Sequence, residues 1–315
     1  MKRTLKKLIC LLFVAVIVLN TGCSNKQSES SKTANSNELQ TKSKHNIVFL
    51  DKYVEDYINK FEDGAMNNEE LLLETVFNPI LQEYSVEFKG LLPKTIEDIT
   101  ELKKELSNLK KKRANIEKII DYSLSKCNEL LPTSEDFSVY ILLEDPKVFK
   151  QYNVPVRAVT PISGVMLLIL NPNAADFTTL LPHTVAHEYH HGSIDMRKFK
   201  KENLVTQLMS EGKAENFAHI LFPNVKSKLA SKLNEREEYT IWNEIKDRLL
   251  NEDENYINEI LNGTKDGLPL LSGYRLSYKI VHEFLDKNPK VTVKEWTDME
   301  AENILEKSGY LERWK

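Results

Sequence analysis

The sequence predicts an α+β fold with a helical N-terminal part, a small mixed sheet with an antiparallel edge strand, two helices rich in histidine and glutamate, and a helical C-terminal part. Three observations favour this fold. Apolar residues recur at intervals of three and four positions from Leu50 to Leu124, which is the spacing of one helix face. They alternate at every second position from Phe137 to Leu143, as in a half-buried strand. Helical spacing then returns and continues toward the C-terminus.

The first 22 residues have the pattern of a secretion signal. Four basic residues precede an apolar run from Leu8 to Leu19, which is too short for a comfortable membrane span. The following Gly22-Cys23 resembles a bacterial lipoprotein cleavage site, which implies that Cys23 is the lipidated first residue of the mature protein. An uncleaved N-terminal anchor is the alternative. Either arrangement would hold the body of the protein at the extracytoplasmic face of a bacterial cell membrane.

Residues 23–45 contain almost no apolar side chains, so they cannot bury a core and are predicted to form a disordered tether. About 270 residues remain, which is enough for one large domain or two closely packed ones. We divide them into an N-terminal helical region at 46–133 and a second region at 134–315, which contains the histidine-rich motif described below.

The charge of the chain argues against a nucleic-acid partner. The sequence has 43 basic and 47 acidic residues, and loss of residues 1–22 would remove four basic residues and no acidic ones, leaving a net charge of −8. No basic patch interleaved with aromatic residues is visible in the sequence. Of the 3 cysteines, Cys10 would leave with the signal and Cys23 would carry lipid. Cys127 then stands alone and is predicted to be a small buried hydrophobic residue.

Helical periodicity divides the N-terminal region into three segments. The first covers residues 50–61 and the second residues 72–84, where Pro79 marks a break or a restart. Thr95 with Asp98 signals the start of the third, which carries apolar residues as far as Leu124. We expect the lysine-rich stretch within this third helix to be a solvated face rather than a binding patch.

Strand-like patterns follow. Beyond the alternation at 137–143, an extended segment lies within 154–160, and a continuous apolar run spans 165–170. The chain passes directly from that run into the histidine-rich segment. The clearest later helices are predicted at 229–250 and 274–285.

The stretch His187-Glu188-Tyr189-His190-His191 has the most informative spacing in the chain. In a helix, His187 and His191 lie four residues apart on one face, so both imidazoles can bind one zinc ion. Glu188 lies beside them, where its carboxylate can take a proton from a metal-bound water. A polar helix face with coincidental histidines is the alternative interpretation.

Signals at both ends support a helix here. Asp176, Thr178 or Thr179 can begin it, Pro182 is tolerable only in its first turn, and Gly192 can end it.

Two more histidines lie within this helix. His183 precedes His187 by one turn on the same stripe, and we interpret it as a residue that supports the ligands, or as a structural residue, rather than as a third ligand. His190 points off that face and is expected to be solvated or to face the substrate.

A third ligand must come from further along the chain. The helical pattern at 204–217 carries Glu211 and Glu215 one turn apart, and nineteen residues separate His191 from Glu211. With this spacing the chain resembles the gluzincin metallopeptidases, the thermolysin-like and related aminopeptidase families. In them HExxH is followed at such a distance by a glutamate ligand on a second helix. The resemblance implies a Zn²⁺ site made of His187, His191 and Glu211 on zincin-type helices.

Further motifs narrow the resemblance. The run Ala-His-Glu-x-x-His, then Glu-Gly-x-Ala-Glu, then Gly-Tyr-x-x-x-Tyr near the C-terminus looks most like a family of predicted zinc-dependent proteases catalogued as a domain of unknown function. The resemblance covers roughly residues 137–290. It implies an edge strand that binds an extended substrate main chain to main chain, here at Val165, Met166, Leu167 and Leu168. A buried core strand is a compatible reading of the same residues.

Two supporting roles remain to be filled. Glu215 can accept a hydrogen bond from the far nitrogen of a ligand histidine, and a surface carboxylate is the alternative. Tyr274 is the first choice for a donor to the oxyanion that forms when water adds to a carbonyl, because the resemblance places a Gly-Tyr step there. Tyr278 could share the same face, and His282 is the runner-up donor. Simple packing of both tyrosines against the metal helices is an equal alternative.

These observations predict a membrane-anchored, extracytoplasmic zinc peptidase that acts on a peptide or protein substrate, with Glu188 as general base. Two other functions stay open. The same water and base could hydrolyse a non-peptide amide or ester, or the chain could be a lipoprotein that binds a ligand and keeps a structural metal site.

Overall fold

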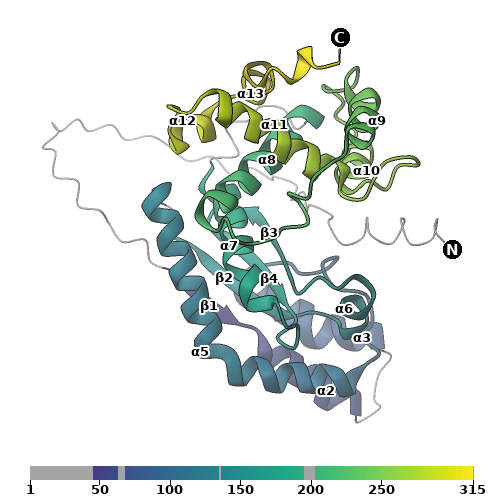
Figure 1. Cartoon of the computed structure of the whole chain (residues 1–315). Coiled ribbons are helices and arrows are strands. Elements are labelled where there is room, and N and C mark those ends of the chain that lie inside the picture. The colour runs from purple at the N-terminus through teal and green to yellow at the C-terminus, as the bar shows by residue number, and fades with distance from the viewer. Residues whose placement is uncertain (1–44, 63–67, 135, 195–202, 315) are drawn as a thin grey trace, which may run out of the picture.

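The computed structural model describes residues 45–62, 68–134, 136–194 and 203–314. The predicted signal at 1–22, Cys23 and nearly all of the predicted tether lie outside these residues. Within them, a small mixed sheet is surrounded by helices (Figure 1). The α+β fold predicted from the sequence is confirmed.

The sheet has four strands in the order β1-β2-β4-β3. Strands β1, β2 and β4 are parallel, and β3 runs antiparallel to β4 at one edge, as predicted. Helical periodicity did not predict β1, which lies in the region expected to be helical. The bounds are β1 Asn46–Phe49, β2 Ser138–Leu143, β3 Val156–Ile162 and β4 Val165–Leu170.

The prediction that Val165, Met166, Leu167 and Leu168 form a substrate-binding edge is wrong. Strand β4 lies between β2 and β3, so sheet partners occupy both of its sides. Met166, Leu167 and Leu168 are buried. The continuous apolar run is therefore that of a core strand, and among the described strands β1 and β3 form the two edges of the sheet, with β3 next to β4.

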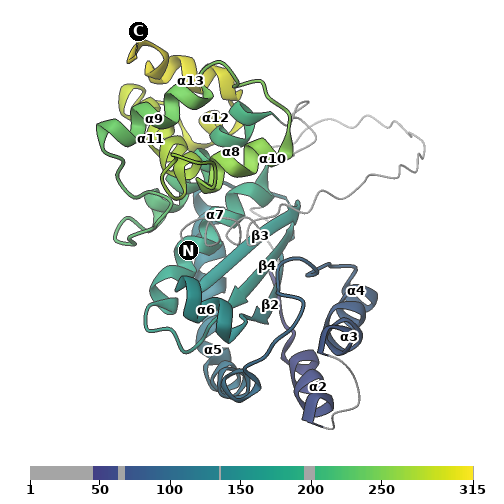
Figure 2. The ribbon, with the colours of Figure 1, turned by 90° about the vertical axis from the view of Figure 1, so that its right-hand side faces the viewer.

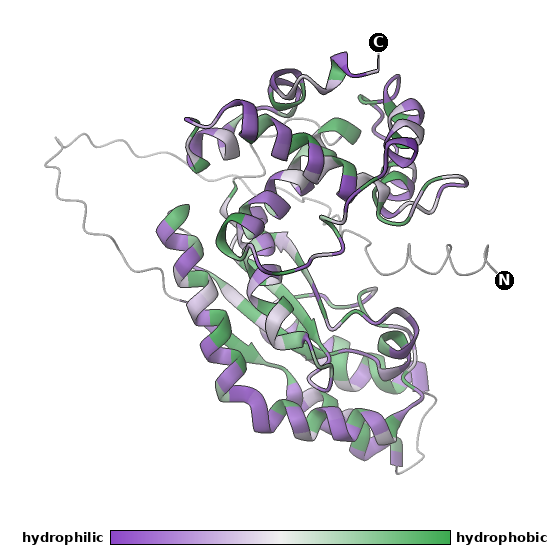
Figure 3. Cartoon of the chain, viewed as in Figure 1, coloured by the Kyte–Doolittle hydropathy of each residue, from purple (hydrophilic) through white to green (hydrophobic). Residues whose placement is uncertain are grey.

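The N-terminal helices follow the predicted periodicity. Helix α4 restarts at the expected place, with Pro79 in its first turn, where a missing N–H costs nothing. The Asp98 side chain caps the long helix α5 by accepting from the backbone N–H of Glu101 at 3.0 Å. In Figure 3 much of α5 is hydrophilic and the sheet beside it is hydrophobic. The bounds are α2 Asp51–Glu62, α3 Asn68–Leu72, a π-helical turn at Leu73–Phe77, α4 Asn78–Tyr84 and α5 Ile99–Leu130.

Helices α8 to α13 gather at one end of the molecule, away from α2 to α4 (Figure 2). The helix expected at 229–250 is shorter, because Asn234 and Glu237 form a capping box that begins it at Glu235. The bounds are α6 Pro146–Tyr152, α7 Phe177–Ser193, α8 Leu204–Leu221, α9 Glu235–Ile245, α10 Glu254–Asn262, α11 Ser272–Lys287, α12 Val293–Asp298, α13 Ala301–Ser308 and a 3-10 turn at Tyr310–Glu312.

Helix α7 differs from expectation at two positions. Pro182 lies inside it, beyond the first turn, and so removes the hydrogen bond to the carbonyl of Thr178. Gly192 does not end the helix, which continues to Ser193. A Cβ atom at Gly192 would lie 2.7 Å from the ring of Phe137, so glycine allows α7 to approach the sheet closely.

Cys127 is fully buried on α5, as predicted. None of the helices in the ranges that the structure describes combines the length and the apolar character needed to cross a membrane.

Candidate metal centre

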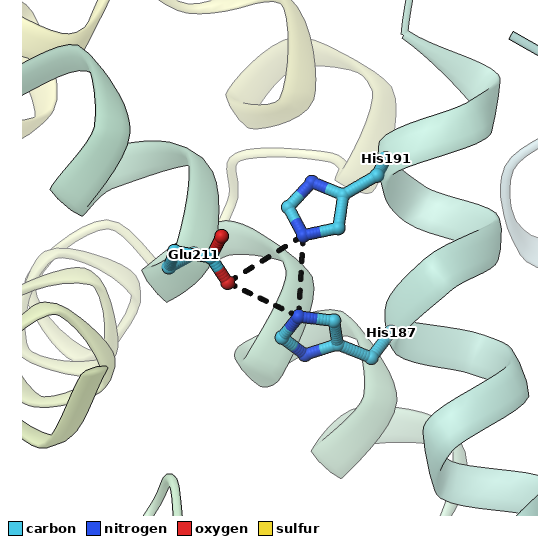
Figure 4. A group of neighbouring side chains, drawn as sticks. All are labelled: His187, His191 and Glu211. Carbon is cyan, nitrogen blue, oxygen red and sulfur yellow. Dashed lines mark hydrogen bonds and ion pairs between the residues drawn. The ribbon is translucent and has the colours of Figure 1, made fainter. Parts of the chain in front are cut away.

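His187, His191 and Glu211 meet between α7 and α8 (Figure 4). Nε2 of His187 lies 3.2 Å from Nε2 of His191 and 3.2 Å from Oε2 of Glu211, and Nε2 of His191 lies 3.5 Å from the same oxygen. Three atoms bound to one tetrahedral zinc ion would lie about 3.4 Å apart. The three side chains therefore have the spacing of a zinc site. In the part of the chain that the structure describes, no other three histidine, cysteine, aspartate or glutamate side chains bring their possible ligand atoms close enough to share one ion.

The packing of α8 explains how Glu211 reaches the histidines. Helix α8 packs against α7 on one side and α11 on the other. At Gly212 a Cβ atom would lie only 2.4 Å from the carbonyl oxygen of Ser277, so α8 and α11 touch through backbone. The glycine next to Glu211 thus places α8 by its contact with α11.

The side chains of this centre interact strongly with one another. Burial alone would lower the pKa of His187, but hydrogen bonds to Glu211 and Glu215 outweigh it and hold that pKa well above its usual value. Burial would raise the pKa of Glu211, but the charge of His191 and hydrogen bonds from both histidines bring it below its usual value. The centre therefore favours positive charge beside Glu211, which is also what a cation site requires.

Glu215 lies behind His187. Its Oε2 is 3.0 Å from Nδ1 of His187, and its side chain is buried, so the surface alternative is wrong. Its Oε1 lies 3.6 Å from Nε2 of His183, and within the described residues neither of these buried atoms has a hydrogen bond. His183 and Glu215 thus form a second layer behind the three candidate ligands.

The carboxylate of Glu188 is held by a residue that sequence reasoning missed. Oγ1 of Thr160, on β3, lies 2.9 Å from Oε2 of Glu188 and 3.1 Å from the Glu188 carbonyl oxygen. Only the pairing of β3 with β4, and the packing of α7 on them, brings these two residues together. No local sequence signal marks Thr160.

The prediction that His190 is solvated or faces the substrate is wrong. Its ring is fully buried and stacks on Trp296, with centroids 5.4 Å apart. Its Nε2 lies 3.2 Å from Oγ1 of Thr297. Burial, followed by the nearby charges of His191 and Lys213, holds the pKa of His190 well below its usual value. This histidine is a neutral packing residue between α7 and α12.

The three candidate donors to the oxyanion, Tyr274, Tyr278 and His282, lie on α11 in different surroundings. Tyr274 is buried, and burial together with the negative charges of Glu211 and Glu188 raises its pKa well above the usual value. Its hydroxyl therefore stays protonated near both carboxylates. Tyr278 instead stacks on His282, with centroids 5.4 Å apart, and Nδ1 of His282 lies 3.1 Å from Oδ1 of Asn216.

Comparison with known proteins gives one match. Residues 116–306, more than half of the chain, match the model of a family described as "Predicted Zn-dependent protease (DUF2268)". The matched segment contains the second half of α5 and all of α7, α8 and α11. No curated protein and no solved structure matches the chain.

Proposed function

The chain belongs to this family of predicted Zn-dependent proteases, and we propose that it is a zinc-dependent peptidase of the gluzincin type with Glu188 as general base. The observation that carries the proposal is the convergence of His187, His191 and Glu211, with the carboxylate of Glu188 on the same helix as the two histidines. Three protein ligands leave one position of a tetrahedral ion open, as in catalytic rather than structural zinc sites.

The residues would divide the chemistry as follows. A bound Zn²⁺ would act as a Lewis acid and lower the pKa of a bound water. Glu188 would accept a proton from the attacking water and pass it to the leaving amine. Glu215, which accepts a hydrogen bond from Nδ1 of His187, would leave Nε2 with its lone pair free for the metal. The buried, protonated Tyr274 would donate a hydrogen bond to the developing oxyanion.

The edge position of β3 favours a peptide over a compact amide or ester as the substrate. Strand β3 is an edge of the sheet, and its residue Thr160 contacts the proposed base. An extended peptide could add to the outer side of β3, main chain to main chain, and so bring a peptide bond toward the metal centre.

We propose the location of the protein from the sequence of its first residues. The basic and apolar segment that ends at Gly22-Cys23 supports export and lipid attachment at Cys23. The peptidase would then work at the extracytoplasmic face of a bacterial membrane.

The function is tested by replacing Glu188 with glutamine, which keeps the shape of the side chain and removes its ability to accept a proton. Turnover of an unbiased peptide library should fall by about a hundredfold or more, while the zinc content measured by mass spectrometry stays unchanged. His191→Ala should lose zinc as well as activity. Near-normal turnover in the glutamine variant, or a purified wild-type protein that loads zinc and cleaves no peptide, would contradict the proposal.

A further inference from the structure

We propose that Thr160 is a positioning residue that fixes the carboxylate of the general base. This inference rests on the proposed function, because it assigns a role within the same reaction. It starts from the contact between Oγ1 of Thr160 and Oε2 of Glu188 at 2.9 Å. Glu188 is 7% exposed, so water competes little for its carboxylate.

An irregularity in β3 brings Thr160 to this place. Val159 pairs with Leu167 and Ile162 pairs with Val165, so Thr160 and Pro161 together face one residue of β4. Such a bulge bends a strand and re-aims one side chain. Pro161 suits the position because an edge strand does not need its N–H there. The bulge therefore aims the Thr160 hydroxyl at α7.

Gly192 makes the short distance between β3 and α7 sterically feasible. A Cβ atom there would lie 3.2 Å from Cγ2 of Thr160 and 2.7 Å from the ring of Phe137. The Ser163 hydroxyl donates to the carbonyl of Gly192 at 2.7 Å and closes the same seam. Thr160 is thus confined by Gly192 at its methyl group and by Glu188 at its hydroxyl.

The Thr160 hydroxyl can donate only one hydrogen bond at a time. A hydroxyl carries one hydrogen, which can go either to the Glu188 carboxylate or to the Glu188 carbonyl oxygen at 3.1 Å. The charged carboxylate is the stronger acceptor. With one lone pair of Oε2 engaged in this way, Oε1 is the oxygen that keeps both of its lone pairs available for the proton of the attacking water. Thr160 therefore favours Oε1 as the proton acceptor and limits rotation of the carboxylate.

The same contact links the base to the substrate. Thr160 belongs to the edge strand on which a peptide would pair, so the strand that would align the substrate also holds the base. Both reacting partners would then be positioned from one rigid element, as accurate catalysis requires.

The test compares Thr160→Val, which keeps the shape and removes the hydroxyl, with Thr160→Ser, which restores it. For Thr160→Val, kcat should fall roughly ten- to a hundredfold, with KM and zinc content unchanged, and Thr160→Ser should recover most of the rate. Ser163→Ala is the matched control, because it removes a hydrogen bond of the same seam that does not reach Glu188. Its kcat should stay within about twofold of wild type. Thr160→Ala replaces the valine variant if valine is not tolerated.

The outcomes separate this inference from the proposed function. Wild-type kcat in Thr160→Val, beside an inactive Glu188→Gln, would overturn the role of Thr160 and leave the peptidase intact. Should the wild-type protein cleave no peptide, the proposed function fails, and crystal structures of wild type and Thr160→Val decide instead. A Glu188 carboxylate in the same place in both structures would overturn the inference, and a displaced one would support it.

Discussion

Glu105 is a carboxylic acid buried on α5, far in sequence from the metal ligands. Its Oε1 accepts from the Asn171 side chain at 2.8 Å, and its Oε2 has no hydrogen bond within the described residues. Burial, with the negative charges of Glu101 and Glu144 next in size, raises the pKa of Glu105 to about 8. The residue is therefore held in its protonated form at neutral pH. Its contribution to the free energy of unfolding depends on pH.

Glu105→Gln should remove this pH dependence. Because the pKa of Glu105 is raised in the folded state, the folded chain keeps a proton that the unfolded chain has lost. The contribution of Glu105 to the free energy of unfolding is therefore greatest below the ordinary pKa of a glutamate. It is lost as pH rises toward about 8, by about 1.4 kcal/mol for each pH unit. The gain of the glutamine variant over wild type should thus grow from pH 5 to about pH 8 and then stay constant.

The measurement is the free energy of unfolding in denaturant at several pH values. Asp121→Asn, at an exposed position of the same helix, is the control and should run parallel to wild type. If the difference in the free energy of unfolding between the glutamine variant and wild type were the same at every pH, Glu105 would be ionised in the folded protein.

At the scale of elements, α8 is the piece on which the candidate site depends most. It carries Glu211 and Glu215 toward α7, and its opposite face meets α11, which carries Tyr274. Lys213 on the same helix donates to the carbonyls of Thr297 and Met299 at the end of α12. One helix thus places the third ligand, its neighbouring carboxylate and two of the surrounding helices.

Gly212→Ala should disturb this arrangement. The new methyl group would lie 2.4 Å from a backbone oxygen and 2.8 Å from Cγ2 of Val281, so α8 and α11 must separate. We expect a loss of about 1–3 kcal/mol in the free energy of unfolding, together with weaker zinc binding because Glu211 moves with the backbone. Gln207→Ala on the same helix is the control, with an expected change of less than about 0.5 kcal/mol. Unchanged stability and zinc affinity would show that the helices tolerate a wider spacing.

At the scale of the whole molecule, the family match and the fold do not have the same extent. The match begins at residue 116, within α5, whereas the sheet of this chain also contains β1 at Asn46–Phe49. The N-terminal part therefore adds one strand and α2 to α4 to the matched region, and it covers the outer side of β2. The opposite edge of the described sheet is β3, which lies within the matched region.

Cys23→Ala should release the whole protein from the membrane if lipid on Cys23 is the anchor. The variant should appear in the soluble fraction after cell fractionation, because its mature chain would lack both the apolar signal and the lipid. Cys127→Ala is the control and should remain with the membrane, since Cys127 is a buried core residue. A Cys23→Ala protein found with the membrane after signal cleavage would contradict the lipid anchor.

The sequence predicted what is periodic or local. The helix with His187 and His191, the start of α5 near Thr95 and Asp98 and the restart at Pro79 all depend on residues within a few positions of each other. The four residues of β1 were missed because they form a strand only by pairing with β2, far along the chain.

The mistaken residues depended on partners from elsewhere in the chain. His190 points away from the ligand face of α7 as expected, but α12 covers it, and no spacing within α7 contains that information. Val165 to Leu168 have the composition of a strand, yet only the positions of β2 and β3 decide that this strand is central. Thr160 was missed for the same reason, since its contact with Glu188 crosses from the sheet to a helix.

The parallel pairing of β1 also determines where the chain enters the body. The backbone N–H of Asn46 bonds to the carbonyl of Phe137 at 2.8 Å, and the ring of Phe137 lies against Gly192, one residue beyond a candidate zinc ligand. Entry is therefore at the metal-bearing end of the sheet. Twenty-two residues lead from Cys23 to His45, and a chain of that length reaches at most about 75 Å. If Cys23 carries lipid and the protein is the proposed peptidase, this length would restrict hydrolysis to within about 75 Å of the membrane surface, so that only substrates close to the bilayer could be cleaved.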